Sequence, residues 1–177
     1  VLMITSAGQT RGFRRVALHP LGSLDDHAYV LADSEATTLI IDPNPAFVER
    51  AIGLLGKVDG LTQVLTIGPV PAELAATDAR VVDLTAEAEK YPPRPLTAAP
   101  LAPDYVNGLS YTGGTTGKPK GVMMTTQATT TMTTVQLAEW EWPDKPRFLM
   151  LTPLSHAGAA YFLPTLVKGG ELHVMAK

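Results

Sequence analysis

Short apolar runs alternate with longer mixed segments along most of the chain. The runs are continuous and rich in Val, Ile and Leu, which is typical of strands covered on both faces in a parallel sheet. Because helical segments lie between them, the pattern predicts an α/β fold with a mostly parallel sheet flanked by helices. The predicted strands are Arg15–Leu18, Thr37–Asp42, Gln63–Gly68, Arg80–Leu84, Leu109–Thr112, Phe148–Thr152 and Glu171–Met175.

Two of the segments between the strands carry residues that start and stop helices. Leu24–Asp33 follows Ser23, a favourable N-cap, and has two acidic residues in its first turn, where the helix dipole favours negative charge. Ala46–Leu55 follows a proline and ends at a glycine, the usual residues at the two ends of a helix. Both segments are predicted helices.

Two other segments break the alternation. Tyr91–Pro103 contains five prolines, which predict an extended connector rather than a helix or a central strand. It separates a first α/β part, residues 1–90, from a second, residues 104–177. Met124–Gln136 is dominated by threonine, whose stiff branched side chain leaves the choice between helix and strand open on propensity alone. We expect a helix over Met124–Glu139.

Composition limits the classes of function. The chain has 177 residues, which fits one domain, and 45% of them are hydrophobic, as in ordinary globular proteins. The net charge of −3 and the lack of any block of like charges argue against a nucleic-acid partner. No apolar run is long enough to span a membrane, and the first residues lack the features of a secretory signal. A cytoplasmic protein is therefore expected.

Candidate metal ligands are few. The chain contains no cysteine, so disulfides and thiolate metal sites are excluded. His19, His27 and His173 are scattered through the sequence without the spacing of metal ligands, and no metal-binding residue is predicted.

The segment with the most chemical information is Leu109–Val122, LSYTGGTTGKPKGV. A predicted strand leads into three glycines, three threonines and two lysines within residues 112–120. Glycines let the backbone approach a ligand closely, and successive N–H groups in such a loop bind anions. The hydroxyl and ammonium groups add hydrogen-bond donors and positive charge. Because open α/β sheets bind ligands beyond the carboxyl ends of their strands, this loop is a candidate phosphate-binding site.

Two alternatives to a specific phosphate loop could also produce such a pattern. Solvated turns rich in Gly, Thr and Lys are common, and a glycine cluster by itself is a weak signal. The Walker A loop of nucleoside triphosphatases has the pattern G-x-x-x-x-G-K-[ST], but Gly113 and Gly117 are too close together for it. Pro119 also occupies the position of the magnesium-binding Ser or Thr and removes a backbone donor. We therefore reject a Walker A loop.

The residues Tyr111–Val122 resemble the signature loop of the adenylate-forming (AMP-binding) superfamily, Y-T-[SG]-G-T-T-G-x-P-K-G-V. Acyl-CoA synthetases, luciferases and the adenylation domains of peptide synthetases belong to it. The resemblance follows the family's order along nearly the whole chain, through VALHPLGS at Val16–Ser23, FLMLTPLSH at Phe148–His156 and GGELHV at Gly169–Val174. It implies that residues 1–177 are a fragment of the family's large N-terminal domain and that the small C-terminal domain is absent.

The resemblance also implies roles for individual residues. In the family this loop holds the β- and γ-phosphates of ATP while the carboxylate of the acid attacks the α-phosphorus. The lysines would neutralise the leaving pyrophosphate. His156 matches the histidine of a P-L-x-H motif near the acyl pocket, and its alternative role is to cap the helix that follows. The implied phosphate-binding residues are Thr112, Gly113, Gly114, Thr115, Thr116, Gly117, Lys118 and Lys120.

The implied function is that of an ATP-dependent, AMP-forming acid–CoA ligase. Such an enzyme uses ATP and Mg²⁺ to convert a carboxylic acid to an acyl-adenylate with release of pyrophosphate, and then forms a thioester with coenzyme A. Peptide-synthetase domains usually carry an aspartate in the P-L-x-H segment for the amino group of their substrate, and no aspartate occurs in Thr152–Gly158. A fatty or aryl acid is therefore favoured over an amino acid, and a fatty-acid–CoA ligase is the expected class.

Several motifs of the complete family are missing from the sequence. There is no Y-G-x-T-E motif for magnesium, no T-G-D motif for ribose and no C-terminal domain with the catalytic lysine, so no catalytic residue is expected in this chain. We expect the chain to be a piece of a longer enzyme, with the remainder of that enzyme as its partner, and to be inactive alone. The alternative is a non-catalytic nucleotide- or partner-binding module derived from the family.

Overall fold

The computed structural model describes residues 2–95, 97–112, 118–151 and 160–175, which group into two compact units. The first unit comprises Val1–Ala17, Leu96–Ser110 and Val122–Lys177, and the second comprises Leu18–Pro95 and Tyr111–Gly121. Each unit therefore combines segments that are distant in the sequence.

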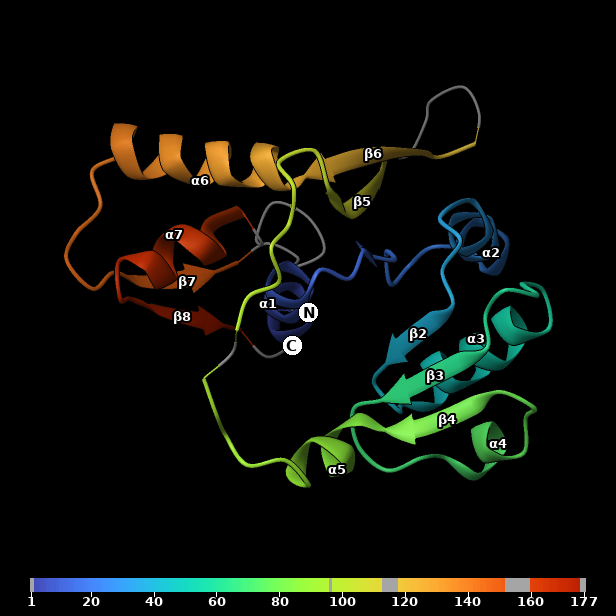
Figure 1. The fold of residues 1–177 in the computed structure, drawn as a ribbon. Coiled ribbons are helices and arrows are strands. Elements are labelled where there is room, and N and C mark those ends of the chain that lie inside the picture. The colour runs from blue at the N-terminus through green and yellow to red at the C-terminus, as the bar shows by residue number, and fades with distance from the viewer. Residues whose placement is uncertain (1, 96, 113–117, 152–159, 176–177) are drawn as a thin grey trace. The chain divides into compact units, whose positions relative to one another are not determined.

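The second unit contains a parallel sheet with the strand order β2-β3-β4. Leu39 lies beside Val64, and Val64 lies beside Val81, in adjacent strands. The strands are β2 (Thr38–Ile41), β3 (Gln63–Thr66) and β4 (Arg80–Asp83). The helices described in this unit are α2 (Leu24–Asp33), α3 (Pro45–Leu55), α4 (Ala72–Ala75) and α5 (Leu84–Glu89), as labelled in Figure 1. A helix follows each strand, which is the connection that lets neighbouring strands run parallel.

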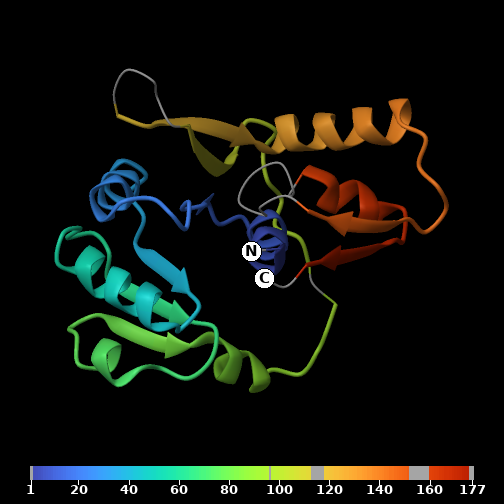
Figure 2. The same ribbon diagram turned by 180° about the vertical axis from the view of Figure 1, so that it is seen from behind.

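Helix α3 covers one face of this sheet (Figure 2) and supplies much of the core. It begins where the side chain of Asn44 accepts a hydrogen bond from the backbone N–H of Phe47 at 3.1 Å, with a proline in the first turn. Ala51 and Leu54 are at most 1% exposed and belong to the same apolar cluster as Val64 of β3. Full burial of one leucine or valine side chain contributes about 1.5–3 kcal/mol, so this contact stabilises the unit.

The described residues of the first unit form two small sheets. In one of them β1 (Arg15–Val16) pairs in parallel with β5 (Val106–Thr112), and β5 also pairs with β6 (Lys120–Thr125). In the other, β7 (Arg147–Met150) pairs in parallel with β8 (Glu171–Val174). The last residues of β5 and the first residues of β6 belong to the second unit. The helices described here are α1 (Leu2–Arg11), α6 (Thr126–Glu139) and α7 (Phe162–Val167).

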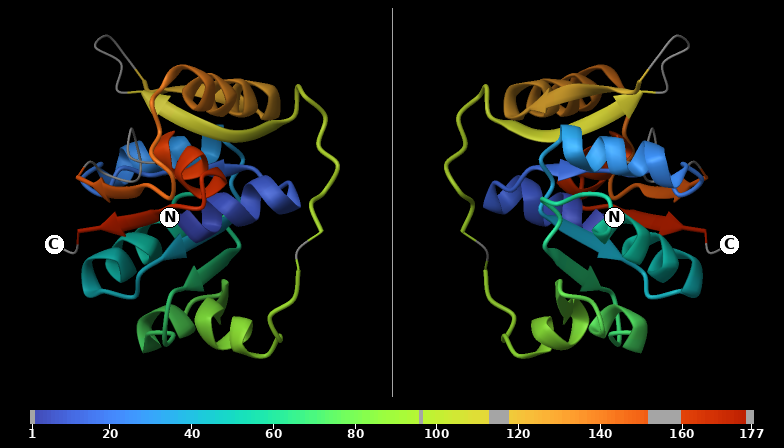
Figure 3. Two further views of the ribbon diagram at one scale, coloured as in Figure 1. Left: turned by 90° about the vertical axis from the view of Figure 1, so that its left-hand side faces the viewer. Right: turned by 90° about the vertical axis from the view of Figure 1, so that its right-hand side faces the viewer.

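The proline-rich connector is extended, as predicted. Residues 91–95 and 97–105 contain neither helix nor strand, and Figure 3 shows them as a long trace without regular structure. Within the first unit, Ala99 N–H donates to the carbonyl of Thr10 at 2.7 Å, and the hydroxyl of Tyr105 donates to the carbonyl of Gly12 at 2.5 Å. The second half of the connector is therefore hydrogen-bonded to α1, and Tyr105, just after the connector, is hydrogen-bonded to the turn that follows α1.

The α/β fold class is confirmed, and most predicted elements occur near their expected positions. Helix α2 spans the predicted residues, and α3 begins one residue earlier than predicted, at Pro45. Most predicted strands are shorter in the structure, because the apolar runs continue past the residues that pair. Strand β5 instead starts earlier, at Val106, and its Gly108 and Leu109 pair with β1.

The threonine-rich segment is a helix, although it starts later than predicted. Met124 and Thr125 lie in β6, a strand that was not predicted, and α6 begins at Thr126 with Thr125 as its N-cap. Thr129 and Thr133 donate their hydroxyl hydrogens to carbonyls four residues earlier, at 3.1 and 3.0 Å. These bonds give the threonine hydroxyls a partner within the helix, although threonine remains a poorer helix former than alanine.

Candidate phosphate-binding site

The predicted phosphate loop joins strand β5 to strand β6. Its central residues, 113–117, lie outside the described residues, and so does His156. Thr112 at the end of β5, Lys118 just before β6, and Lys120 at its first position are described, and all three are exposed. The chain on the two sides of the loop therefore offers a hydroxyl and two ammonium groups to solvent.

Tyr111, at the start of the signature loop, is hydrogen-bonded to helix α2. Its hydroxyl donates to Oδ2 of Asp33, and the two oxygens are 2.5 Å apart. Burial raises the pKa of Tyr111 above its ordinary value of 10.0, and the hydrogen bond to Asp33 and the negative charge of that carboxylate raise it further. The phenol therefore stays protonated at neutral pH and remains a hydrogen-bond donor.

Lys118, on the other side of the loop, contacts a second residue of α2. Its Nζ atom lies 5.1 Å from the centroid of the Tyr29 ring, within the range of a cation–π interaction. Tyr29 and Asp33 are four residues apart in α2, so they lie on the same face of the helix. One face of α2 thus contacts the chain both before and after the loop.

Gly121 of β6 allows the chain to pass close to Tyr111 after the loop. A β-carbon at this position would lie 3.0 Å from Cζ and 3.2 Å from the hydroxyl oxygen of Tyr111. Both distances are shorter than ordinary van der Waals contact, so a side chain here would displace the ring. Packing against Tyr111 therefore explains the glycine at the P-K-G position of the signature.

Helix α2 is itself fixed within the second unit. Ser23 and Asp26 form a capping box, in which Ser23 Oγ accepts from the N–H of Asp26 at 3.0 Å and Asp26 Oδ2 accepts from the N–H of Ser23 at 3.4 Å. Leu24 packs closely against Gly53 of α3. A β-carbon added at Gly53 would lie only 3.2 Å from the Leu24 side chain. The helix therefore has a defined start and a close contact with its neighbour.

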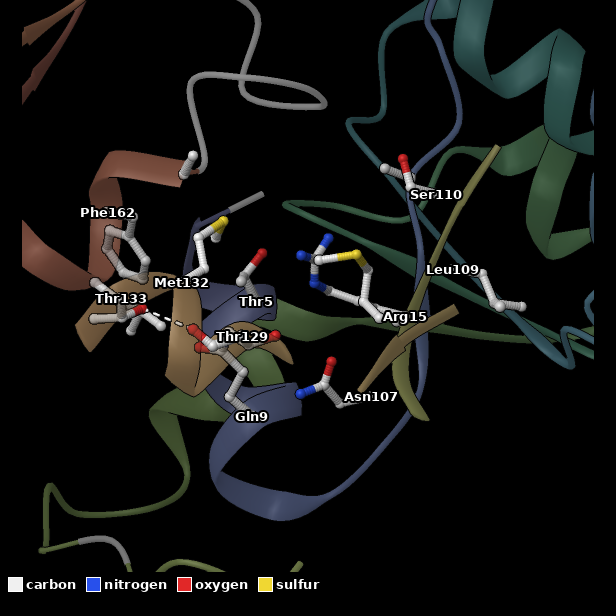
Figure 4. A pocket seen from close by; sticks show the side chains of 15 residues that line it. Thr5, Gln9, Arg15, Asn107, Leu109, Ser110, Thr129, Met132, Thr133 and Phe162 are labelled. Carbon is white, nitrogen blue, oxygen red and sulfur yellow. Dashed lines mark hydrogen bonds between the residues drawn. The ribbon is translucent and has the colours of Figure 1, made fainter. Parts of the chain in front are cut away.

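The first unit contains a cavity of about 340 Å³ (Figure 4). It is lined by side chains of α1, β5, α6 and α7, among them Gln9, Asn107, Met132 and Phe162. Arg15 of β1 also lines it, and burial lowers the pKa of its guanidinium. None of the predicted phosphate-binding residues that the structure describes borders this cavity.

Comparison with known proteins identifies the family. The sequence signature of the family described as AMP-binding enzyme matches residues 2–177. The chain belongs to this family. Over 177 residues it is 68% identical to the medium/long-chain-fatty-acid–CoA ligase FadD8 of Mycobacterium tuberculosis, covering 100% of this chain and 30% of that protein. Over 150 residues it is 36% identical to a feruloyl-CoA synthase of an Amycolatopsis species, covering 83% of this chain and 25% of that protein.

The fold agrees with this membership. The structure is similar to that of the amide bond synthetase McbA of Marinactinospora thermotolerans, with a TM-score of 0.77 and 25% identity, covering 98% of this chain and 32% of McbA. The chain therefore spans about a third or less of the length of these relatives. In the ranges that the structure describes, no helix is both long and apolar enough to cross a membrane.

The predicted family resemblance is confirmed, whereas the roles of the individual site residues stay predictions. Sequence reasoning did not find the contacts of Tyr29 and Asp33 with the loop. The two residues stand four apart in a helix that the sequence predicts, but nothing near them in the sequence points to Tyr111 or Lys118. Their contact with the loop becomes visible only in the folded chain.

Proposed function

We propose that this chain supplies the ATP-phosphate-binding part of an AMP-forming medium- or long-chain fatty-acid–CoA ligase. The observation that carries the proposal is the 68% identity to such a ligase across the whole chain, together with the signature loop at residues 111–122. The complete enzyme would convert a fatty acid and ATP to an acyl-adenylate and pyrophosphate, and then transfer the acyl group to coenzyme A. It would be a cytoplasmic ligase of fatty acid metabolism.

In the first step the loop would neutralise the negative charge that develops on the leaving pyrophosphate. A carboxylate oxygen of the acid bonds to the α-phosphorus of ATP, and the bond from that phosphorus to the oxygen bridging to the β-phosphate breaks. The leaving pyrophosphate takes the electron pair of the broken bond. Lys118 and Lys120, which are exposed beside the loop, neutralise this charge, and Thr112 adds a hydroxyl donor. Catalysis of such a step depends mainly on positioning and charge neutralisation, which these groups supply.

Mg²⁺ is expected to enter with ATP and to neutralise part of the charge on its phosphates. Within residues 2–95, 97–112, 118–151 and 160–175, no group of three His, Asp or Glu side chains could hold a metal ion. Any protein ligands for this ion are expected in the remainder of the complete enzyme, together with the groups that bind ribose and coenzyme A.

The test uses the purified complete enzyme with ATP, coenzyme A and a series of acids. We expect release of AMP and pyrophosphate that depends on a medium- or long-chain fatty acid, and an isolable acyl-adenylate when coenzyme A is left out. Ferulate is the matched competitor, because a feruloyl-CoA synthase is 36% identical to this chain. A preference for ferulate would overturn the substrate class, and release of ADP in place of AMP would overturn the reaction.

A further inference from the structure

We propose that helix α2 positions the phosphate loop from both sides, through Asp33 before the loop and Tyr29 after it. The family signature includes neither residue, and neither has to touch ATP in order to act. The inference rests on the proposed function, because it assigns positioning residues to the loop that would bind ATP there. Tyr29 and Asp33 are called the α2 pair below.

The contacts of the α2 pair lie at the two ends of the loop. Tyr111, whose hydroxyl is 2.5 Å from Asp33, directly precedes Thr112, the first predicted phosphate-binding residue. Lys118, whose Nζ is 5.1 Å from the Tyr29 ring centroid, is itself a predicted phosphate-binding residue. One turn of a helix thus fixes where the loop leaves β5 and where it returns toward β6.

The kind of contact on each side preserves positive charge at the loop. An aromatic ring can hold an ammonium group in place without neutralising it, whereas a carboxylate in the same position would cancel its charge. The acidic member of the pair, Asp33, accepts a hydrogen bond from the neutral hydroxyl of Tyr111 instead. Among the described residues no carboxylate forms an ion pair with Lys118. The charge of Lys118 therefore remains available to an anionic ligand.

Hydrogen bonds and packing hold the support behind these contacts in place. Helix α2 has a capping box at its start and packs against α3 through Leu24 and Gly53. On the side of the loop, the Tyr111 ring lies against Gly121, where a β-carbon would come within 3.0 Å of it. Donors that are held in place before the ligand arrives need no reorganisation during the reaction, so a rigid support favours binding of the phosphates.

A double-mutant cycle in the complete enzyme tests the contact between Asp33 and Tyr111. Asp33→Ala and Tyr111→Phe should each raise the KM for ATP in adenylation about threefold to tenfold, because each removes one hydrogen bond at the end of the loop. The double variant should be no worse than either single variant, because both substitutions remove the same contact. Transfer of the acyl group from pre-formed acyl-adenylate to coenzyme A should be unchanged in all three.

Two matched controls separate positioning from general stability. Tyr105→Phe removes another tyrosine hydroxyl that donates at 2.5 Å, in this case to the carbonyl of Gly12. Asp25→Ala removes a carboxylate of the same helix that pairs with Lys57 at 2.8 Å. Both controls should leave the KM for ATP unchanged, and the melting temperatures of all variants show how much each loses in stability.

Substitutions of Tyr29 test the charge argument. Tyr29→Phe keeps the ring and should retain most of the affinity for ATP. Tyr29→Leu removes the ring and should raise the KM for ATP about threefold. Tyr29→Glu should raise it most, because the new carboxylate pairs with Lys118 and cancels its charge. The KM for ATP should therefore rise in the order Tyr29→Phe, Tyr29→Leu, Tyr29→Glu.

The possible results separate the inference from the proposed function. A complete enzyme that forms no acyl-adenylate from any fatty acid would overturn the proposed function, and the inference with it. An active enzyme in which the α2-pair variants behave like Tyr105→Phe and Asp25→Ala would overturn the inference alone. Additive effects in the cycle, or equal slowing of adenylation and thiol transfer, would also overturn it, because both indicate a general structural role.

Discussion

His27 lies on the buried face of α2, between a carbonyl oxygen and a guanidinium group. Its Nε2 atom is 2.8 Å from the carbonyl oxygen of His19, and its Nδ1 atom is 3.2 Å from Nη1 of Arg50. Because a guanidinium can only donate, Nδ1 accepts, Nε2–H donates, and the ring is neutral. Burial lowers the pKa of His27, as do the charges of Arg50 and His19, whereas the bond to the His19 carbonyl and the charge of Asp26 act in the opposite direction.

The free energy of unfolding should therefore fall as the pH is lowered from about 7.5 to about 5.5. The unfolded chain takes up a proton at His27 near its ordinary pKa of 6.5, whereas the folded ring stays neutral to lower pH. The unfolded state thus binds more protons in this window, and stability is lost as the pH falls. Urea unfolding at several pH values measures the loss.

Two histidine variants control this measurement. His27→Gln can keep both hydrogen bonds without titrating, so its pH dependence should be smaller than that of the parent. His173→Gln changes an exposed histidine, and the pH dependence of the parent should persist. An undiminished loss in His27→Gln would show that another group causes it.

At the residue scale the sequence predicts the phosphate loop but not its support. The glycines, threonines and lysines of the loop are consecutive, so their chemistry is visible without a structure. Asp33 is 78 positions away from Tyr111, and in the sequence it is only the last residue of a predicted helix. No local sequence pattern predicts a contact over such a separation.

At the element scale, two threonine-to-alanine substitutions in and beside α6 should have opposite effects. The Oγ1 of the N-cap Thr125 accepts from the N–H of Ala128 at 3.1 Å, so Thr125→Ala should lower the free energy of unfolding by about 1 kcal/mol. Thr130 is exposed, and its hydroxyl donates back to the carbonyl of Thr126 at 2.9 Å. Thr130→Ala should raise the free energy of unfolding by up to about 0.5 kcal/mol, because alanine is the better helix former.

Urea unfolding of the two variants decides this point. Both substitutions make the same chemical change. Opposite signs of the change in the free energy of unfolding would therefore reflect only the position of each threonine in the helix. Destabilisation by both substitutions would mean that the hydroxyl of Thr130 contributes more than helix propensity does.

The elements that were predicted best are those with strong local signals. Helices α2 and α3 follow the N-caps Ser23 and Asn44, and their first residues were predicted to within one position. The start of α6 was predicted two residues too early, because threonines before and inside the helix look alike in sequence. Strand β6 was missed because its short apolar run, VMM at residues 122–124, adjoins the threonine-rich segment that was predicted as a helix, and its pairing with β5 is visible only in the folded chain.

At the scale of the whole molecule, the fold class and the family follow from the sequence, whereas the activity of this chain alone stays a prediction. The chain covers 30% of its 68%-identical relative. We expect the 177-residue chain alone to show no acid-dependent exchange of pyrophosphate into ATP, because the ribose, magnesium and catalytic-lysine motifs of the family do not occur in it. An exchange assay with labelled pyrophosphate compares the chain with the complete enzyme. Acid-dependent exchange by the chain alone would refute this expectation.

The most direct test of the phosphate-binding loop times the two half-reactions separately in the complete enzyme carrying Thr116→Val. Valine keeps the shape of threonine and removes one hydroxyl. If that hydroxyl bonds to a phosphate, adenylation should slow about tenfold to a hundredfold, a rise in the barrier of roughly 1.5–3 kcal/mol. Transfer from pre-formed acyl-adenylate to coenzyme A should keep its rate, because pyrophosphate has already left. Unchanged adenylation, or equal slowing of both half-reactions, would contradict a pyrophosphate-binding role for this loop.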